Sequence, residues 1–284
     1  MSKIGLLASF EGLHRRDGYY ALEAMRLALT ELTPATVAVI PLAIDVGDNP
    51  AQAQRAAAKL LLDRSLDALI GPYQPEQIQA IQPLLATNDV FWLAPTFINQ
   101  EQGFTPDIKV WLRALITTVA EEADQQGGER LVLAGWRPAE PTLGKLDWLE
   151  TMTIPITVAD DPAAVHATDA VLWLGAPEDA VAYFTVLRQT QPALPFWLAF
   201  QGDSLIFAER ATVTGPVYWT IWLDEGYAQW SQQHPSLPPS AYLTYQATKQ
   251  ALKTSVIKQS ASTSLSWRAH TFTIKEDGTL EEKR

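Results

Sequence analysis

Short apolar runs alternate with longer amphipathic segments along the whole chain. Ile4–Ala8 and Ala68–Ile70 have the length and the continuous hydrophobicity of buried β-strands. Tyr19–Leu32 carries its apolar residues at helical spacing, and Pro50–Asp63 and Pro75–Ala86 each begin with a proline, which suits the first turn of a helix. Strands that alternate with helices in this way predict parallel sheets that helices cover on both faces.

The same alternation begins again near the middle of the chain. Leu131–Ala134 is the first predicted strand of this second run, and the glycine pair Gly127-Gly128 precedes it. Later, Gln233–Ser240 is rich in proline and poor in apolar residues, which is typical of a connection between structural units. The sequence therefore predicts an α/β fold with two doubly wound parallel-sheet lobes.

The loops that follow the predicted strands are the expected place for a ligand. In open parallel sheets, ligands bind outside the carboxyl ends of the strands. Tyr73-Gln74 lies at such an end, between a predicted strand and a predicted helix. The corresponding segments after four other strands are Ser9-Phe10-Glu11, Thr96-Phe97, Trp136-Arg137 and Gln201-Gly202-Asp203. Two lobes that face each other would line a cleft with these loops.

Charge and cysteine content argue against several classes of function. A formal net charge of −11 disfavours nucleic acid or an anionic membrane as a partner, since both require a positive face. The chain contains no cysteine, which removes disulfides, thiolate chemistry and cysteine metal sites. Its four histidines lie far apart in the sequence. We therefore expect neither a metal site nor a cofactor.

Motif searches favour binding over catalysis. The sequence has no GxGxxG fingerprint, no phosphate-binding Walker loop and no G-x-S-x-G nucleophile turn. Asp45 and Asp48 allow a metal-binding interpretation, but capping and turn formation explain them better. No nucleophile, base and orienting residue occur together as a catalytic set requires. We expect a protein that is not an enzyme.

Several longer segments occur in a characteristic order and spacing. They read IGLLASFEG, DGYYALEAMRLALTEL, DVGDNPAQAQRAAAKLLLD, DALIGPYQPEQIQAIQPLLATNDVFWLAPTF, AYLTYQATKQAL and FTIKEDGTL. Together they resemble the type I periplasmic binding proteins, in the leucine/isoleucine/valine-binding branch of the ABC-transporter solute receptors. The resemblance runs over most of the chain and is strongest in about the first hundred residues.

The resemblance implies two lobes that are joined by hinge strands and close around a small solute. It implies a first lobe of residues 1–114 with 240–262, a second lobe of residues 115–239 with 263–284, and a ligand cleft between them. It also implies a monomer that is periplasmic or extracellular and has an ABC transporter permease as its partner. Because Met1-Ser2-Lys3 runs directly into the first predicted strand, we expect that a leader has been removed; a cytoplasmic protein is the less favoured alternative.

The predicted pocket departs from that family where a ligand carboxylate would bind. The resemblance implies small hydroxyl residues and backbone N–H groups on the loops after the third and fourth strands. Tyr73 and Gln74 occupy the first of these loops, where serines are expected. In the second loop Thr96 keeps a hydroxyl, and the backbone of Thr96 and Phe97 can still donate N–H groups, but Ile98 stands where a threonine is usual.

The resemblance also implies an acid that binds a ligand ammonium, and this sequence differs from the family at that position too. Gln201 occupies it, with Asp203 two residues later, and a neutral amide cannot offset a desolvated ammonium as a carboxylate does. In the first loop Asp17 replaces an aromatic residue. Glu11 on that loop either binds a cationic ligand group or meets arginines in solvent. The family's charged contacts are therefore altered in this sequence.

Aromatic side chains favour a pocket for planar or apolar ligands, or for cations over ring faces. Trp219 is one of these side chains, although a place in the core fits the sequence equally well. The predicted ligand-binding residues are Ser9, Phe10, Glu11, Asp17, Tyr73, Gln74, Thr96, Phe97, Trp136, Arg137, Gln201, Asp203 and Trp219.

The function predicted on these grounds is that of an extracytoplasmic solute-binding protein of an ABC importer. Its ligand would be an amino acid or an amino-acid-like molecule, aromatic ones included, held in the cleft by hinge closure. The alternative is a ligand-sensing regulatory domain of the same fold that is not coupled to transport.

Overall fold

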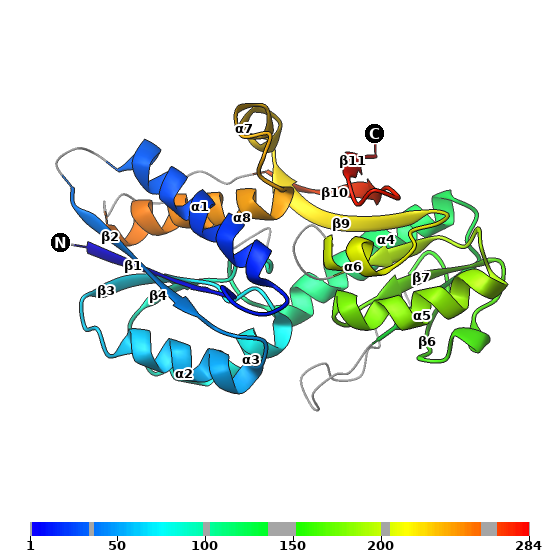
Figure 1. Ribbon diagram of the computed structural model, residues 1–284, viewed down its shortest axis with the longest axis horizontal. Helices are drawn as coiled ribbons and strands as arrows, with labels where there is room; N and C mark the ends of the chain where they lie inside the picture. Colours follow the sequence, from blue (N-terminus) through cyan, green and yellow to red (C-terminus); the bar gives the residue numbers. More distant parts are fainter. Residues whose placement is uncertain are drawn as a thin grey trace. The chain divides into compact units, whose positions relative to one another are not determined.

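The computed structural model describes residues 2–33, 37–98, 103–135, 152–199, 205–256 and 266–283. The sequence pattern also predicts a helix over residues 143–151, which lie outside the described residues. Four predicted site residues, Trp136, Arg137, Gln201 and Asp203, lie outside them as well. The chain divides into two compact units, Met1–Ile108 with Leu223–Trp267 and Lys109–Trp222 with Arg268–Arg284. Figure 1 shows the elements of both units.

The first unit is built on a four-stranded parallel sheet with the order β2-β1-β3-β4. The apolar run predicted at its centre forms β1, whose residues from Ile4 onward are buried. Pro41 in β2 cannot donate a hydrogen bond to a neighbouring strand, and β2 is an edge strand that tolerates it. The strands are β1 (Ser2–Ala8), β2 (Val39–Asp45), β3 (Leu66–Ile70) and β4 (Phe91–Leu93).

Helices cover both faces of this sheet. In Figure 1, α1 and α8 lie together on one face, and α2 and α3 lie together on the other. Asn49 caps α2, because its side-chain oxygen accepts the backbone N–H of Gln52 at 3.0 Å. The helices are α1 (Arg15–Leu32), α2 (Pro50–Leu61), α3 (Pro75–Leu85), α7 (Tyr227–Gln233) and α8 (Pro239–Ala251), the last continued by the π-helical turn η3 (Leu252–Val256).

The short helix α7 belongs to the first unit through its aromatic packing. The ring centroid of Trp230 on α7 lies 5.1 Å from that of Tyr242 and 5.9 Å from that of Tyr245, both on α8. The chain therefore passes from the second unit to the first at 222/223. The proline-rich segment before α8, where the sequence predicts a lobe boundary at 239/240, lies within the first unit of this division.

The second unit is built on a seven-stranded sheet with the order β11-β10-β9-β8-β7-β5-β6. Strands β5 to β9 pair in parallel, and β10 and β11 form the predicted antiparallel hairpin around Asp277. The strands are β5 (Arg130–Ala134), β6 (Ile156–Val158), β7 (Asp169–Trp173), β8 (Phe196–Leu198), β9 (Val217–Asp224), β10 (Trp267–Ile274) and β11 (Leu280–Glu282).

Neighbouring residues of β8 show which helices cover which face of that sheet. Phe196 packs edge-on against Phe184 of α5, and the Nε1–H of Trp197 donates to Glu122 of α4 at 3.2 Å. Successive side chains of a strand point to opposite faces, so α4 and α5 lie on opposite sides. The helices are α4 (Ile108–Gln125), α5 (Pro177–Thr190), α6 (Leu205–Arg210) and the 3-10 turn η2 (Pro162–Ala164). The predicted doubly wound α/β fold with two parallel sheets is confirmed.

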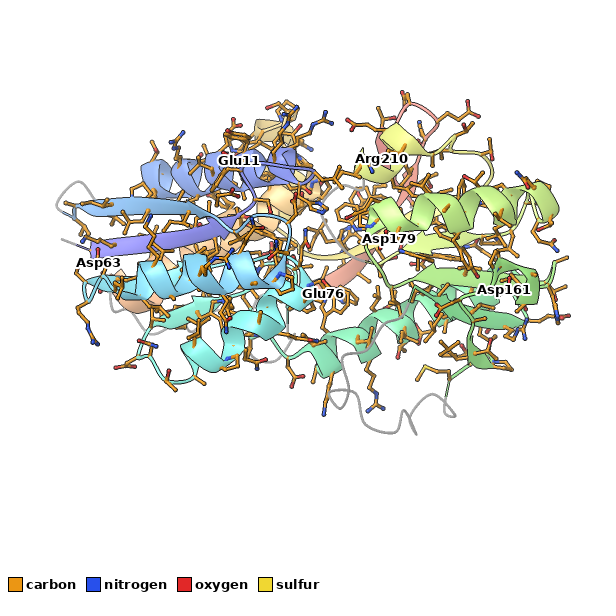
Figure 2. The ribbon with its side chains drawn as sticks, turned by 60° about the horizontal axis from the view of Figure 1, so that its bottom comes forward. Glu11, Asp63, Glu76, Asp161, Asp179 and Arg210 are labelled. Carbon is orange, nitrogen blue, oxygen red and sulfur yellow. The ribbon has the colours of Figure 1, made fainter. Side chains whose placement is uncertain are left out.

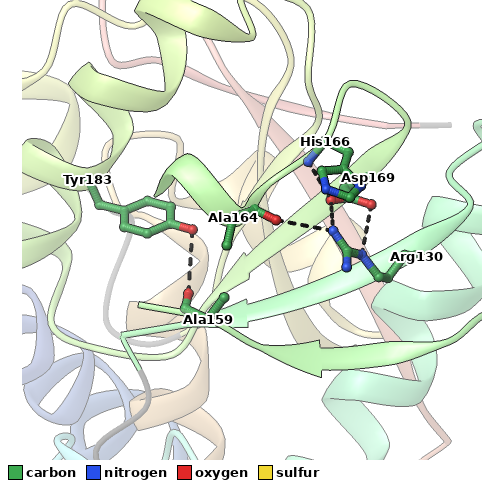
Figure 3. A network of polar contacts seen from close by, with 6 residues as sticks. All are labelled: Arg130, Ala159, Ala164, His166, Asp169 and Tyr183. Atoms are coloured by element: carbon green, nitrogen blue, oxygen red, sulfur yellow. Dashed lines mark hydrogen bonds and ion pairs between the residues drawn. The ribbon is translucent and has the colours of Figure 1, made fainter. Parts of the chain in front are cut away.

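An ion pair joins the first residues of β5 and β7 in the second unit. Arg130 and Asp169 are partners in the parallel register, and the guanidinium Nε donates to Asp169 Oδ1 at 2.9 Å. Asp169 is 3% exposed and also accepts the backbone N–H of His166 at 2.6 Å, as Figure 3 shows. The second nitrogen of the guanidinium, Nη2, also donates to the carbonyl of Ala164 at 3.2 Å. This bidentate contact fixes one end of the sheet.

Candidate functional site

The strand order of the first unit identifies the place where its loops separate. From β1 the chain moves to β2 on one side, and then returns to β3 on the other side of β1. The loops after β1 and β3 therefore leave in opposite directions, which is the topological switch point where open α/β sheets bind ligands. Figure 2 shows Glu11 and Glu76, which follow these strands, toward one end of the unit and Asp63 toward the opposite end.

The loop after β1 is fixed by hydrogen bonds to the loop after β2. Asp45 Oδ1 accepts the backbone N–H groups of Phe10 at 2.8 Å and Gly47 at 3.1 Å. The buried hydroxyl of Ser9 and the side-chain amide of Gln77 each donate to the carbonyl of Gly47 at 3.0 Å. Asp45 therefore has the turn-forming role that the sequence favoured over metal binding. Ser9 supports the loop, since its hydroxyl already has a partner.

The first turn of α1 lies directly against this loop. A Cβ atom on Gly18 would lie 1.8 Å from the carbonyl oxygen of Ser9, so only glycine permits the approach. The adjacent Asp17 is brought to the same place and is partly buried. The ring of Phe10 meets Tyr19 edge-on at 5.7 Å, and Glu11 is exposed.

The loop after β3 places Tyr73 beside α8. Gly71 has a φ of +84°, and a Cβ atom there would lie 2.2 Å from the carbonyl oxygen of Leu7, so the turn requires glycine. Trp92 holds the turn by donating its Nε1–H to the carbonyl of Gly71 at 2.7 Å. The hydroxyl of Tyr73 is hydrogen-bonded to the Thr244 hydroxyl at 2.7 Å. Burial raises the pKa of Tyr73, so this hydroxyl stays protonated.

Asp17 is the acid of this site with the most altered ionisation. Desolvation raises the pKa of its carboxyl group from 3.8 to about 6, and the nearby charges of His14 and Arg16 lower it only in part. The negative charge of Asp17 in turn contributes to the raised pKa of Tyr73. Phe10, Asp17 and Tyr73 thus belong to the two segments that leave the switch point, one after β1 and one after β3.

The loop after β4 contributes less than the sequence predicts. Thr96 is partly buried, whereas the side chain of Phe97 is 0% exposed. The backbone N–H of Phe97 donates to the carbonyl of Ala94 at 3.0 Å, closing a turn. The expectation that this N–H is open to a ligand carboxylate is therefore wrong for the described conformation. Gln74, which precedes α3, is partly buried like Tyr73.

Trp219, predicted for the second unit, is buried among other aromatic side chains. It is 3% exposed, and its ring lies 5.8 Å from that of Phe272 on β10. Trp222 on the same strand is likewise buried and lies 6.1 Å from Trp111. These contacts favour the core alternative for Trp219.

Sequence reasoning missed several residues that the fold brings to the switch points. Thr244 lies on a helix far along the chain, and only the packing of α8 beside β3 reveals its contact with Tyr73. In the second unit, the strands that follow β5 and β7 in the sequence, β6 and β8, lie on opposite sides of the β5–β7 pair, which is a second switch point. The loop after β7, with Gly175 and Ala176, therefore belongs among the candidate positions. The order of the strands in the sheet is the signal that would have identified this loop from the sequence.

Two cavities formed by described residues lie in the second unit, with volumes of about 520 and 510 Å³. The first is lined by residues around the β10–β11 turn, such as Lys275 and Asp277. The second is polar and contains Arg268, His270 and Glu122. Neither contains a predicted site residue. Among the described residues, no group of three His, Cys, Asp or Glu side chains is arranged to hold a metal ion, and no helix has the length and hydrophobicity to cross a membrane.

Comparisons with known proteins give a clear result for the fold alone. No family model and no curated protein matches the sequence. The leucine-binding protein LivK of Thermotoga maritima superposes with a TM-score of 0.76 at 14% identity, over 100% of this chain and 98% of its own. The chain has the type I periplasmic binding protein fold. The resemblance seen in the sequence is confirmed at that level.

Two further solved structures differ in the ligand that their names give. LivJ, the branched-chain amino acid transporter substrate-binding protein of Streptococcus pneumoniae, was solved with isoleucine; it has a TM-score of 0.65 at 16% identity over 99% of this chain and 97% of its own. A fatty acid ABC transporter substrate-binding protein of Thermomonospora curvata has a TM-score of 0.69 at 12% identity, over 99% of this chain and 91% of its own. The fold thus accommodates ligands of different chemistry.

Proposed function

We propose that the chain is an extracytoplasmic solute-binding protein that delivers an amino acid or an amino-acid-like molecule to an ABC importer. The observation that carries this proposal is the place of Phe10, Asp17 and Tyr73 on the segments that leave the switch point of the first unit. Full-length similarity to transporter substrate-binding proteins supports it. The partner would be a permease, and the protein would work as a monomer outside the cytoplasm.

Hinge closure is the mechanism we propose for ligand capture. The chain passes between its two units three times, at 108/109, 222/223 and 267/268. A few connecting residues can absorb the dihedral changes that closure of two such units requires. The Tyr73 hydroxyl, held by Thr244, presents a fixed polar group beside an aromatic ring.

A thermal-shift screen of the purified protein tests this proposal. The compounds are amino acids, their amides, aromatic acids, polyamines, nucleosides, sugars and fatty acids. A ligand at about one hundred times its Kd adds about 2.7 kcal/mol to stability, which raises Tm by several degrees. We expect at least one amino acid or related compound to do so. Folded protein that no compound stabilises would contradict the proposal.

Replacing Tyr73 tests the position of the site. We expect Tyr73→Ala to weaken binding of the compound that gives the largest thermal shift by about tenfold or more, because an aromatic contact and its polar group are lost. Titration calorimetry measures the change. Tyr218→Ala, a partly exposed tyrosine of the second unit whose hydroxyl contacts Gln126, is the matched control. Equal affinity of Tyr73→Ala and the wild type would place the ligand elsewhere.

A further inference from the structure

The polar cavity of the second unit lies along β10, ahead of the residues that pair with β11. β11 pairs with Phe272–Ile274, and the four preceding residues, from Arg268 to Thr271, line the cavity together with residues of α4 and the end of the hairpin. All of the lining residues belong to this one unit. The volume of about 510 Å³ is within the range of small-molecule sites, and the polar lining suits a charged ligand.

Both carboxylates that line this cavity are already engaged by groups of the protein. Glu122 of α4 accepts hydrogen bonds from the hydroxyl of Thr271 and, at 3.2 Å, from the indole Nε1–H of Trp197. Glu282 contacts Nδ1 of the buried side chain of His270. Since each acid has its donors within the fold, the carboxylates have a structural role and leave little capacity for a cationic ligand.

Arg268, in contrast, keeps most of its capacity as a donor. Its Nε donates to Nε2 of His270 at 3.1 Å, so the imidazole accepts there and its Nδ1–H faces Glu282. These contacts fix the direction of the guanidinium. A guanidinium has five N–H donors, and no hydrogen bond or ion pair between described residues uses the four on its terminal nitrogens. They form the flat pair of nitrogens that binds two oxygens of an oxyanion side by side.

Lys283 brings a second positive charge to the same cavity. Its ammonium lies 5.0 Å from the ring centroid of Tyr218, a cation–π contact that leaves its N–H donors available to a ligand. Gln125, near the end of α4, adds an exposed amide. The formal net charge of −11 repels anions from the protein as a whole, so anion binding here would depend on these local donors.

We infer that this cavity is a second ligand site, which binds the phosphate group of a small anionic molecule, in addition to the site proposed at the switch point of the first unit. Arg268 would hold two phosphate oxygens through its terminal nitrogens, and Lys283 would balance the remaining negative charge. A phosphate group carries a charge of about −1.5 to −2 at pH 7, which matches two cations better than the single charge of a carboxylate does.

Calorimetric titration of the full chain at pH 7.5 and constant ionic strength tests the inference. The probes are inorganic phosphate, phenyl phosphate and, as a singly charged oxyanion, acetate. Arg268→Gln removes the charge and the flat pair of donors, whereas Arg268→Lys keeps the charge alone. Arg210→Gln removes the same charge from another exposed position of the second unit and is the matched control.

We expect both phosphate probes to bind wild type and Arg210→Gln with a Kd of about 1 mM or below, and acetate to bind more weakly. Arg268→Gln should weaken phosphate binding by about tenfold or more, and Arg268→Lys by a smaller factor. Because Arg268 is exposed, its variants should keep the urea midpoint of wild type, which shows that the fold is intact. Equal phosphate affinity in wild type and Arg268→Gln, tighter binding of acetate than of phosphate, or no binding of either phosphate probe would overturn the inference.

Discussion

Arg130→Ala is expected to lower the free energy of unfolding of the second unit by about 3–5 kcal/mol, because it leaves a buried carboxylate without its partner. Asp169 is 3% exposed and is held by the guanidinium in a two-point contact. The backbone N–H of His166 also donates to it, so the carboxylate cannot move out to solvent without breaking the start of β7. Urea unfolding of the full chain measures the loss.

Three comparisons separate this effect from a general loss of charge. Arg130→Lys keeps the charge but not the planar two-point geometry, so we expect an intermediate loss. The double replacement Arg130→Met with Asp169→Leu should recover much of the stability, since it leaves no unpaired charge. Arg210→Ala, at an exposed position of the same unit, should stay within about 0.5 kcal/mol. An Arg130→Ala protein as stable as Arg210→Ala would contradict the account of this ion pair.

Asp17→Asn is expected to stabilise the protein at pH 7.5 by about 1–3 kcal/mol. The pKa of this acid is raised from 3.8 to about 6 by desolvation. Each unit of pKa shift corresponds to about 1.36 kcal/mol between the two protonation states, and partial exposure of the side chain reduces the total. Because the folded state holds the proton more tightly, ionised Asp17 destabilises the fold, and asparagine removes that cost.

The pH dependence of this gain gives the decisive check. Below about pH 4 the acid is protonated in both the folded and the unfolded state, so wild type and Asp17→Asn should differ little. The gain should appear as pH rises from about 4 to about 6 and stay constant above that range. Thermal unfolding in a series of buffers measures it, with Asp89→Asn, which removes an exposed acid of the first unit, as the control. A variant that is less stable than wild type at pH 7.5 would show that the carboxylate has a structural role.

Such a gain has a functional meaning. Residues that bind ligands are often retained at a cost in stability, and substituting them stabilises the fold while activity is lost. Asp17→Asn would combine higher stability with weaker binding of the tightest-binding compound of the screen. That pair of results would distinguish a binding residue from a residue that supports the fold.

Much of the fold could be predicted because strands such as β1, β3 and β7 are largely buried, and because the helices α2, α3, α5 and α8 each begin at a proline. A continuous apolar run as short as Ala68–Ile70 suits a strand that is covered on both faces. Short helices were harder: α6 and α7 were not predicted, since one or two turns give too few residues for a periodic signal. The apolar pattern also predicts a short run, Val110-Trp111-Leu112, ahead of a helix that ends near Gln126, but in the structure this run is part of that helix, α4, which begins at Ile108.

The site could be predicted only as a set of loops. Strand ends are readable from the sequence, so Tyr73 and its neighbours were placed at a carboxyl edge. The partners of those residues were not readable, because Thr244 comes from a helix that returns late in the chain. The burial and desolvation of individual side chains could not be predicted from the sequence either. Nothing in the sequence indicates that Asp17 is desolvated, that Phe97 is fully buried, or that its backbone N–H closes a turn.

Hydrogen–deuterium exchange with and without the tightest-binding compound of the screen is the most direct test that the chain binds a small molecule at the switch point of its first unit. The account predicts slower exchange in two loops, residues 9–18 after β1 and residues 71–77 after β3, with the same loops unprotected in Asp17→Asn or Tyr73→Ala under equal conditions. Protection confined to the polar cavity around Arg268 and His270, or no protection in either loop, would contradict it.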